Sequence, residues 1–384
     1  MKRVLIVAGE ASADMHAANL VRSLSSISKQ KIEFSGLGGK ELISTGFFTP
    51  EFYNGDFAVS GLWELLGHIR KIYSAQRYFK DMASLGSYDA AVLLDYPDFN
   101  IPLAKHLTKI GVPVIYYVSP QVWVWRKSRM YGLSRNSREI LSIFPFEKDF
   151  YKKHGIDVAY VGHPLLDQIS SYMKTKDTEK LKKEFNIGKD QKIIAVLPGS
   201  RHGEIKYILP VMADVCKELK QRLGDKVRFI VPVAPTIKEQ DIFSMLDTKT
   251  KGLFEIVKDR TYDVYSISDY ALLASGTATV EAGLFELPMT IVYKVSALSA
   301  FLFKHIVRYK NPIGMVNLLL KKELAKEFFQ SDADPVKIAD DVMKNLTDKQ
   351  KYSEFKDELK KLKEILYTGE SPSNVAANQV IKYL

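Results

Sequence analysis

Short apolar runs recur along the whole chain, separated by polar turns and by segments long enough for helices. The clearest runs are residues 4–8, 90–94, 114–118, 193–197, 228–233, 270–274 and 289–293. Continuous apolar runs of this length are typical of parallel strands that are buried on both faces. Strands that alternate with helices in two halves of a chain predict two doubly wound α/β domains, and ligands of such domains bind at the carboxyl ends of the strands.

A segment rich in lysine and glutamate, residues 174–192, has few large apolar groups and lies between the two halves. Such composition is typical of a solvated helix and linker. We therefore expect an N-terminal domain over residues 1–167 and a C-terminal domain over residues 168–345. The remaining residues, 346–384, are expected to form C-terminal helices.

Composition narrows the class of protein. The chain has 384 residues, of which 46% are hydrophobic and 26% charged, as in an ordinary globular protein. The single cysteine, Cys216, excludes an internal disulfide and a cysteine-rich zinc site. No run of eighteen apolar residues occurs, so no transmembrane helix is expected.

The net charge of +10 is compatible with nucleic acid, an anionic membrane face or anionic small substrates. Residues 294–330 contain seven basic and two acidic residues, a net charge of +5, interleaved with large apolar side chains. This mixture favours a membrane-surface patch over a duplex-binding face. A buried helix with lysine side chains reaching to solvent explains it equally well.

Two turns in the second half are candidates for binding a diphosphate. One follows the strand at 270–274 and the other follows the strand at 193–197. Their candidate residues are Gly199, Ser200, Arg201, Ser275, Gly276, Thr277, Ala278 and Glu281. A glycine turn before a helix leaves backbone N–H groups unpaired, and these groups, like an arginine fork, suit phosphate oxygens. Thr277 or Thr279 could cap the helix. Ordinary turns of an α/β domain are the alternative for each stretch alone.

Three turns in the first half are candidates for the other substrate. Asp95 and Asp98 follow a buried strand, where a carboxylate can serve as a general base, although aspartate is also a common cap residue. Glu10, Ser12 and Asp14 follow the first strand and form either a ligand loop or helix caps. That turn lacks the spaced glycines of a dinucleotide fingerprint, so a nicotinamide or flavin cofactor is not expected.

The third turn, residues 119–126, contains two of the three tryptophans, Trp123 and Trp125, followed by Arg126. Aromatic rings pack on sugar faces, and an arginine beside them suits an anionic substrate. A loop anchored to the core by its tryptophans is the alternative.

The ordered motifs together resemble one family. They are Gly9-Glu10-Ala11-Ser12, residues 95–100 (DYPDFN), residues 119–126 (SPQVWVWR), residues 197–201 (LPGSR), residues 274–281 (ASGTATVE) and Asn317-Leu318-Leu319. They look like the lipid-A-disaccharide synthases, inverting glycosyltransferases of family 19. The resemblance implies a GT-B fold, in which two doubly wound Rossmann-like α/β domains face a central cleft. The sequence departs from the family pattern at Ala13, Val316 and Leu320-Lys321.

The resemblance also implies the reaction. The donor is a UDP-linked diacylglucosamine and the acceptor is a diacylglucosamine 1-phosphate. The products are a β-1,6-linked disaccharide 1-phosphate and UDP. The expected place is the cytoplasmic face of the inner membrane of Gram-negative bacteria, bound peripherally. Neither a metal nor an organic cofactor nor nucleic acid is expected. Some members form dimers that exchange the C-terminal part, so residues 346–384 could be exchanged in this way or could cross back to the first domain.

The residues can be given roles in that reaction. Asp95 is the expected base, with Asp98 as its neighbour and substitute, and an oxocarbenium-like transition state is expected. Arg201 and the N–H groups near residues 199–200 and 277 would stabilise the leaving UDP.

Further roles concern binding. Glu281 is expected to accept hydrogen bonds from the ribose, Asn317 to orient sugar or phosphate, and Arg126 to hold the acceptor phosphate. Residues 59–73 and 298–307 are the candidates for an acyl-chain groove.

Two other functions stay open at this point. Another GT-B enzyme, such as a UDP-N-acetylglucosamine epimerase or a soluble glycosyltransferase, would share the nucleotide half but would need no apolar groove. A non-enzymatic basic protein that binds membrane or nucleic acid would bind weakly and in a salt-sensitive way.

Overall fold

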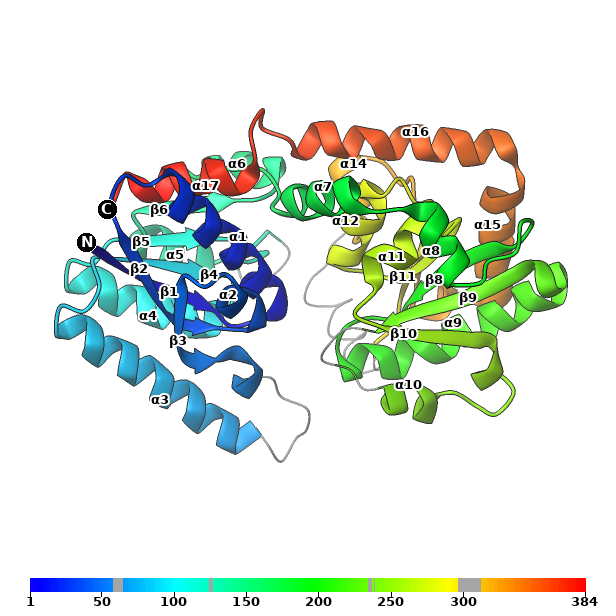
Figure 1. The fold of residues 1–384 in the computed structure, drawn as a ribbon, viewed down its shortest axis with the longest axis horizontal. Coiled ribbons are helices and arrows are strands. Elements are labelled where there is room, and N and C mark those ends of the chain that lie inside the picture. Colours follow the sequence, from blue (N-terminus) through cyan, green and yellow to red (C-terminus); the bar gives the residue numbers. More distant parts are fainter. Residues whose placement is uncertain (58–64, 124–126, 234–236, 238, 296–311) are drawn as a thin grey trace. The chain divides into compact units, whose positions relative to one another are not determined.

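The computed structural model describes residues 1–57, 65–123, 127–233, 237, 239–295 and 312–384. These residues form two compact units. The first unit consists of Met1–Asp167 together with Leu366–Leu384, and the second consists of Gln168–Ile365. Each unit is built around its own parallel sheet, which confirms the predicted fold class of two doubly wound Rossmann-like domains (Figure 1).

The first unit contains a seven-stranded sheet in the order β3-β2-β1-β4-β5-β6-β7, with parallel pairing throughout. Its strands are β1 (Lys2–Ala8), β2 (Ile32–Gly38), β3 (Phe48–Tyr53), β4 (Ala90–Leu94), β5 (Val114–Tyr117), β6 (Glu139–Ser142) and β7 (Ala159–Tyr160). Its helices are α1 (Ala11–Ile27), α2 (Lys40–Ser44), α3 (Leu65–Ser84), α4 (Pro97–Lys109), α5 (Arg129–Asn136), α6 (Pro145–Lys152) and α17 (Pro372–Ile381).

The second unit contains a six-stranded sheet in the order β10-β9-β8-β11-β12-β13, again parallel. Its strands are β8 (Lys192–Leu197), β9 (Val227–Val233), β10 (Phe254–Lys258), β11 (Tyr270–Ala274), β12 (Met289–Tyr293) and β13 (Glu327–Phe329). Its helices are α8 (Thr178–Glu184), α9 (His202–Leu223), α10 (Glu239–Met245), α11 (Thr261–Ile267), α12 (Thr277–Leu284), α14 (Met315–Leu320) and α15 (Pro335–Thr347). Helices α7 (Leu165–Thr175) and α16 (Lys349–Leu366) each contain residues of both units.

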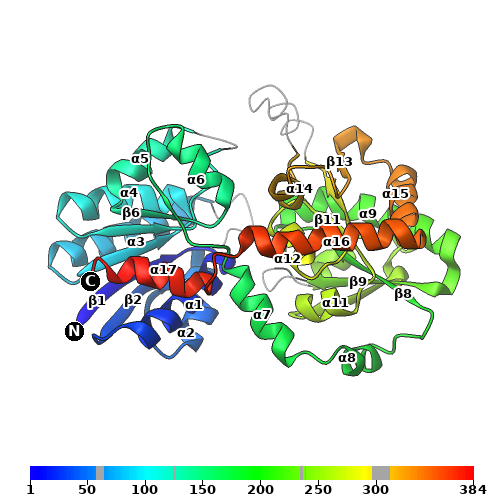
Figure 2. The same cartoon turned by 90° about the horizontal axis from the view of Figure 1, so that it is seen from above.

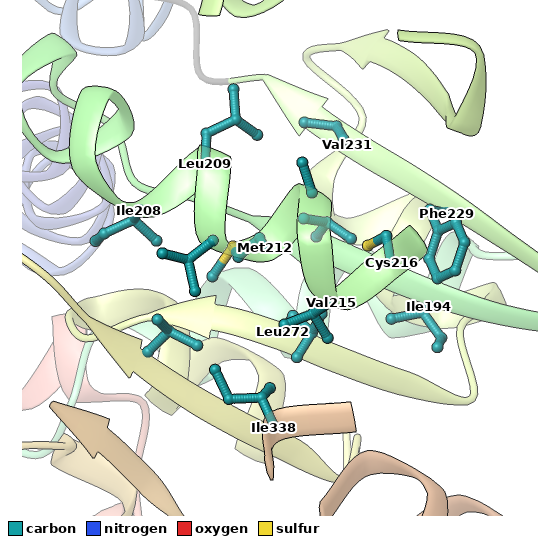
Figure 3. Packing of buried hydrophobic residues seen from close by; sticks show 14 of the residues in the cluster. Ile194, Ile208, Leu209, Met212, Val215, Cys216, Phe229, Val231, Leu272 and Ile338 are labelled. Carbon is teal, nitrogen blue, oxygen red and sulfur yellow. The ribbon is translucent and has the colours of Figure 1, made fainter. Parts of the chain in front are cut away.

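Alternate residues of the central strands face opposite helix layers, as expected for buried parallel strands. In the first unit, Leu5 and Val7 of β1 pack with residues of α3, α4 and α5. In the second unit, Ile194 and Val196 of β8 pack with α9 and α15. Figure 3 labels part of this second core, including Ile208, Leu209, Met212, Val215 and Cys216 of α9, Phe229 and Val231 of β9, and Leu272 of β11.

The last helix returns to the first unit. Helix α17 packs along α1 and buries Ala376, Ala377 and Val380 (Figure 2). The Asp167 carboxylate accepts a 2.9 Å hydrogen bond from the Ser373 N–H at the start of α17. The end of the chain is therefore part of the first core.

Candidate active site

The strand orders place the motif turns at the switch point of each sheet. Strand β1 pairs with β4 in the first unit, and β8 pairs with β11 in the second. In each unit the chain order reverses between these two strands, and ligands of open α/β sheets bind there, outside the carboxyl ends of the strands. The turns after β1 and β4 therefore share one site, and the turns after β8 and β11 share another.

The turn after β4, residues 95–98, is strained and is called the α4 turn below. Asp95 and Tyr96 have φ angles of 45° and 43°, in the left-handed region that non-glycine residues rarely adopt. Val118, which follows the neighbouring strand β5, has a φ of 61°. Each such residue costs roughly 1–3 kcal/mol, and strain of this kind collects at functional sites. The α4 turn is therefore held by its surroundings in an unfavourable conformation.

Two buried polar side chains hold the α4 turn. The Asn100 amide donates to the carbonyl oxygens of Leu94 and Asp95, at 3.0 and 2.8 Å. The Tyr116 hydroxyl donates to the same Asp95 oxygen at 2.5 Å. These hydrogen bonds fix the Asp95 carbonyl and thereby the backbone of this residue. The Asp95 residue itself is half-buried.

The turn after β1 packs directly on the α4 turn. A Cβ at Gly9 would lie 2.4 Å from the Tyr96 ring, so only glycine fits under that ring. Burial raises the pKa of Tyr96, and the nearby carboxylates of Glu10 and Asp98 raise it further. The structure thus brings Glu10, Asp95 and Asp98 into one acidic neighbourhood.

Asp98 differs from Asp95 in its surroundings. Its side chain is 77% exposed at the start of α4 and forms an ion pair with Arg129 of α5. One oxygen of the Asp98 carboxylate is thus engaged by the Arg129 guanidinium. Asp95, whose backbone carbonyl Asn100 and Tyr116 hold, stays the candidate for the base.

Glu147 is a further acidic residue at this end of the sheet. It is fully buried at the start of α6, where its Oε2 accepts the N–H groups of Ile143 and Phe144 at 3.3 and 3.2 Å. Burial raises its pKa to about 8, and the charge of Asp95 adds to the rise, while hydrogen bonds from Phe144, Ile143 and Trp123 oppose it. The first half-site therefore contains a carboxyl group that holds its proton at neutral pH.

Neither Ser12 nor Asp14, which follow β1, caps helix α1, whose N-cap is Glu10. Helix α1 begins at Ala11, so Ser12 lies exposed in its first turn. Asp14 is 3% exposed and accepts hydrogen bonds from Gly39 N (2.6 Å), Glu41 N (2.8 Å) and Leu42 N (3.4 Å). Its carboxylate thus caps α2 from a neighbouring helix. Three backbone N–H groups already bind the Asp14 carboxylate, and its part in binding the acceptor stays a prediction.

Several predicted groups lie outside the described residues. These are Trp125 and Arg126, residues 298–307, and residues 59–64 of the other apolar segment. Trp123 is described, and its ring packs edge-on against Phe146, with centroids 5.1 Å apart. That contact supports the alternative in which Trp123 anchors its loop to the core.

In the second unit, the turn after β8, residues 198–201, is called the α9 turn. Gly199 has a φ of 122°, and a Cβ there would lie 2.7 Å from Glu204 Oε2. Glu204 accepts from the Ser200 N–H at 3.4 Å and pairs with Arg201 at 3.5 Å. The Arg201 side chain is 69% exposed. Its guanidinium is therefore accessible at the start of α9, where an anion is favoured.

The turn after β11, residues 275–278, is called the α12 turn. Gly276 is the N-cap of α12, and no side chain caps the helix. The predicted threonine cap is wrong, because the Thr279 hydroxyl donates to the Gly276 carbonyl at 2.8 Å instead of accepting from the helix. Gly276 and Thr277 are exposed. The first N–H groups of α12 are thus without a side-chain cap at the surface, as an oxyanion site requires.

Glu281 lies one turn further along α12. Burial raises its pKa to about 7, and a hydrogen bond from the Tyr262 hydroxyl opposes the rise. Phe285 contacts the rings of Tyr262 and Tyr265, with centroids 5.3 and 5.4 Å apart. A carboxylate beside aromatic rings is compatible with a ribose ligand.

Asn317 has a different role from the one predicted. It is fully buried, and its Oδ1 accepts from Leu324 N and Ala325 N, both at 2.9 Å. Its Nδ2 donates to Ala325 O at 2.6 Å and to Glu327 Oε1 at 2.8 Å. Both its oxygen and its NH₂ group are thus hydrogen-bonded within the protein, and the expectation that it orients sugar or phosphate stays a prediction.

Sequence reasoning missed the polar residues that support these turns: the buried Tyr116 and Glu147 and the half-buried Tyr262 and Glu327. In the sequence, Tyr116 and Tyr262 resemble ordinary apolar positions. Nothing in the sequence indicates that their hydroxyl groups form hydrogen bonds to these turns. The one available signal was at Glu147, an acidic residue two positions after Pro145. A glutamate at the third position of a helix is typical of a capping box.

Searches for other kinds of site gave two negative findings. Over the described ranges, no group of three or more His, Cys, Asp or Glu side chains is arranged to hold a metal ion. In the same part of the chain, no helix combines the length and the apolar character needed to cross a bilayer.

Solved structures with the same fold include a UDP-sugar enzyme. A UDP-GlcNAc 2-epimerase from Neisseria meningitidis bound to UDP-GlcNAc superposes with a TM-score of 0.65 at 14% identity, covering 99% of this chain and 98% of that one. MurG from Acinetobacter baumannii gives a TM-score of 0.57 at 13% identity, with full coverage of both chains. At such identities the likeness establishes the fold alone.

Sequence relatives are much closer. Lipid-A-disaccharide synthase of Syntrophus aciditrophicus is 36% identical over 366 residues, which are 95% of this chain and 94% of that protein. The Myxococcus xanthus enzyme of the same name is 38% identical over 343 residues, with 88% and 87% covered. The family model described as lipid-A-disaccharide synthetase matches residues 4–381. The chain therefore belongs to the lipid-A-disaccharide synthase family.

Proposed function

We propose that the protein is an inverting glycosyltransferase that makes the lipid A disaccharide. It condenses UDP-2,3-diacylglucosamine with 2,3-diacylglucosamine 1-phosphate, giving the β-1,6-linked disaccharide 1-phosphate and UDP. The observation that carries this function is the family match over residues 4–381. The exposed N–H groups and arginine of the second unit and the carboxylates of the first supply the groups that the reaction needs.

The donor half of the reaction uses the second unit. As the bond between the anomeric carbon and the diphosphate breaks, negative charge gathers on UDP. Arg201 and the N–H groups of the α9 and α12 turns are suited to stabilise that charge without reorganising. Glu281 would accept hydrogen bonds from the ribose hydroxyls. Since burial raises its pKa to about 7, it is partly protonated near neutral pH, and either form can accept such bonds.

The acceptor half uses the first unit. Asp95 would take the proton of the acceptor 6-hydroxyl as its oxygen attacks the anomeric carbon, which passes through an oxocarbenium-like state and inverts. The strained backbone of the α4 turn supports this assignment, because Asn100 and Tyr116 hold the aspartate in a fixed position. Glu10 and Ser12 are then candidates for binding the acceptor sugar.

The acylated substrates suggest work at a membrane surface. Helix α3 exposes Arg70, Lys71 and Arg77 next to Tyr73 and Tyr78. Basic and aromatic side chains on one helix suit an anionic lipid surface. We propose peripheral contact with the inner face of the inner membrane through this helix.

The function is tested by incubating the purified protein with both acylated substrates in detergent and detecting the disaccharide 1-phosphate by mass spectrometry. We expect product only when donor and acceptor are both present, and the new linkage should be β by nuclear magnetic resonance. Transfer to a deacylated acceptor at an equal rate would favour a soluble glycosyltransferase. Conversion of UDP-GlcNAc to its 2-epimer without transfer would favour an epimerase.

A further inference from the structure

Glu327 occupies an unusual position at the edge of the second sheet. It lies on β13, opposite Ile291 of β12. Its Oε2 accepts the Ile313 N–H at 2.8 Å, and its Oε1 accepts the Gly314 N–H at 2.9 Å. One carboxylate therefore binds two consecutive backbone N–H groups just before α14.

Asn317 completes this arrangement. It donates to Glu327 Oε1 at 2.8 Å and anchors Leu324 and Ala325 through its Oδ1. The strand that carries Glu327 and the segment that Glu327 binds are therefore tied together by one buried amide. We call Glu327 and Asn317 the clamp.

The clamp reaches the α12 turn through a single residue. The Ile313 carbonyl, on the residue whose N–H binds Glu327, accepts the Ser275 hydroxyl at 3.4 Å. The backbone here lies close against the sheet, since a Cβ at Gly314 would fall 2.5 Å from Ile291 Cδ1. Ile313 is thus held on one side by the carboxylate and presents its oxygen to the α12 turn on the other.

We infer that Glu327 is a positioning residue for nucleotide-diphosphate binding, acting through Ile313 on Ser275 and the α12 turn. This inference rests on the proposed function, since it assumes that the α12 turn binds the diphosphate. N–H groups stabilise an anion best when they are fixed in advance, so a turn that is held on its protein side binds more tightly.

The carboxylate is the side chain that fits this role. Both of its oxygens accept, whereas a glutamine has one accepting oxygen and one NH₂ group. In Glu327→Gln the NH₂ group would face either the Ile313 or the Gly314 N–H, donor against donor. The substitution keeps the shape of the side chain and disturbs only the position of this segment.

The test is a double-mutant cycle on UDP affinity, measured by calorimetry with the full-length protein. We expect Glu327→Gln to raise the Kd for UDP roughly fivefold to tenfold, and Ser275→Ala to raise it about threefold. Because both act through one contact, the double variant should bind no more weakly than Glu327→Gln alone. Losses that multiply, or a Glu327→Gln affinity equal to that of the parent, would overturn the inference.

A matched control separates positioning from a loss of stability. Glu255 lies on β10, at the other edge of the same sheet, and forms an ion pair with Arg228. Glu255→Gln should leave UDP affinity unchanged. If Glu327→Gln fails to fold, hydrogen exchange on the parent decides: UDP should slow exchange of the Ile313 and Gly314 amides, and unchanged rates would count against the inference.

The same measurements keep the two proposals apart. If the parent binds UDP and makes disaccharide while Glu327→Gln matches it, only the inference fails. If the parent binds UDP but makes no disaccharide, the proposed reaction fails and the cycle still tests the clamp. A parent that binds no UDP overturns both.

Discussion

The two half-sites solve different problems with different backbones. In the first unit, a non-glycine pair, Asp95 and Tyr96, is held at positive φ among buried polar side chains. In the second, the unusual φ falls on Gly199, and the functional groups are an exposed arginine and exposed helix N–H groups. A base must be placed to a fraction of an ångström, whereas a diphosphate needs many donors that it can reach from solvent.

The strained α4 turn and the exposed α9 turn are therefore suited to different tasks. The α4 turn stores backbone strain because Asn100 and Tyr116 restrain it, and such restraint fixes a reacting group. The α9 turn uses a glycine, so its conformation costs little. UDP must also leave after each turnover, and an open site allows that.

The largest expected effect comes from the strained half-site. Asp95→Asn keeps the shape of the side chain and removes the base, so transfer should fall by about 10²–10⁴-fold. UDP affinity should not change, because its proposed ligands lie in the other unit. Initial rates by mass spectrometry and UDP calorimetry check both statements. Asp98→Asn is the control, with an expected loss under about tenfold, and an equal loss in both variants would remove Asp95 as the base.

Burial in the first half-site should also appear in the pH dependence of stability. The pKa of Glu147 is about 8 in the folded state, against 4.5 as its ordinary value. The unfolded chain ionises first, so this group makes the free energy of unfolding fall as pH rises from about 4.5 to about 8. Glu147→Gln should remove that fall, gaining on the order of 2–4 kcal/mol over the parent at pH 8 relative to pH 5.

Tryptophan fluorescence during denaturant unfolding measures this gain, because Trp63, Trp123 and Trp125 all belong to the first unit. Glu33, exposed on β2, supplies the control Glu33→Gln, for which no pH-dependent difference is expected. The same difference between variant and parent at pH 5 and pH 8 would contradict the argument.

In the second unit, a change at Arg201 should affect the binding of UDP. Arg201→Ala removes a charged donor, so UDP should bind more weakly by roughly 1.5–3 kcal/mol, and towards the lower figure because the side chain is exposed. Calorimetry at two salt concentrations measures the loss. Arg222→Ala, on the same helix and paired with Glu218 and Asp340, should leave UDP affinity intact. Unchanged affinity in Arg201→Ala would refute the assignment.

The smallest effect tests the glycine itself. Gly199→Ala places a Cβ at a φ of 122° and against Glu204, which should lower the free energy of unfolding by about 1–3 kcal/mol. Gly203→Ala is matched to it, since that glycine lies in α9 with open space around it and should gain about 0.5–1 kcal/mol. Equal effects of the two changes, measured by denaturant unfolding, would show that the α9 turn carries no such constraint.

The buried strands were predictable because their apolar runs are continuous, and β4 and β11 have the predicted bounds. The edge strand β3, of whose six residues only Phe48 is buried, and the three-residue β13 have no such run. The motif turns were also visible, since glycine, serine and aspartate mark them locally.

Roles that depend on distant partners could not be predicted. Asp14 is bound by N–H groups about twenty-five residues away in sequence, and Asn317 by a loop and a strand that follow it. Their spacing is equally compatible with ligand binding, so only the fold decides. The start of α9 at His202 has no apolar signal either, because His202, Gly203 and Glu204 show no apolar periodicity.

The return of α17 to the first unit fixes the order in which the protein can mature on the ribosome. All of Gln168–Ile365 is synthesised before the nineteen residues of Leu366–Leu384 that complete the first core. Most of the first unit is made early, but the α1 surface that Ala376, Ala377 and Val380 cover stays open until these three residues have been made. The second unit, whose synthesis starts later, is therefore the first to have all of its residues made.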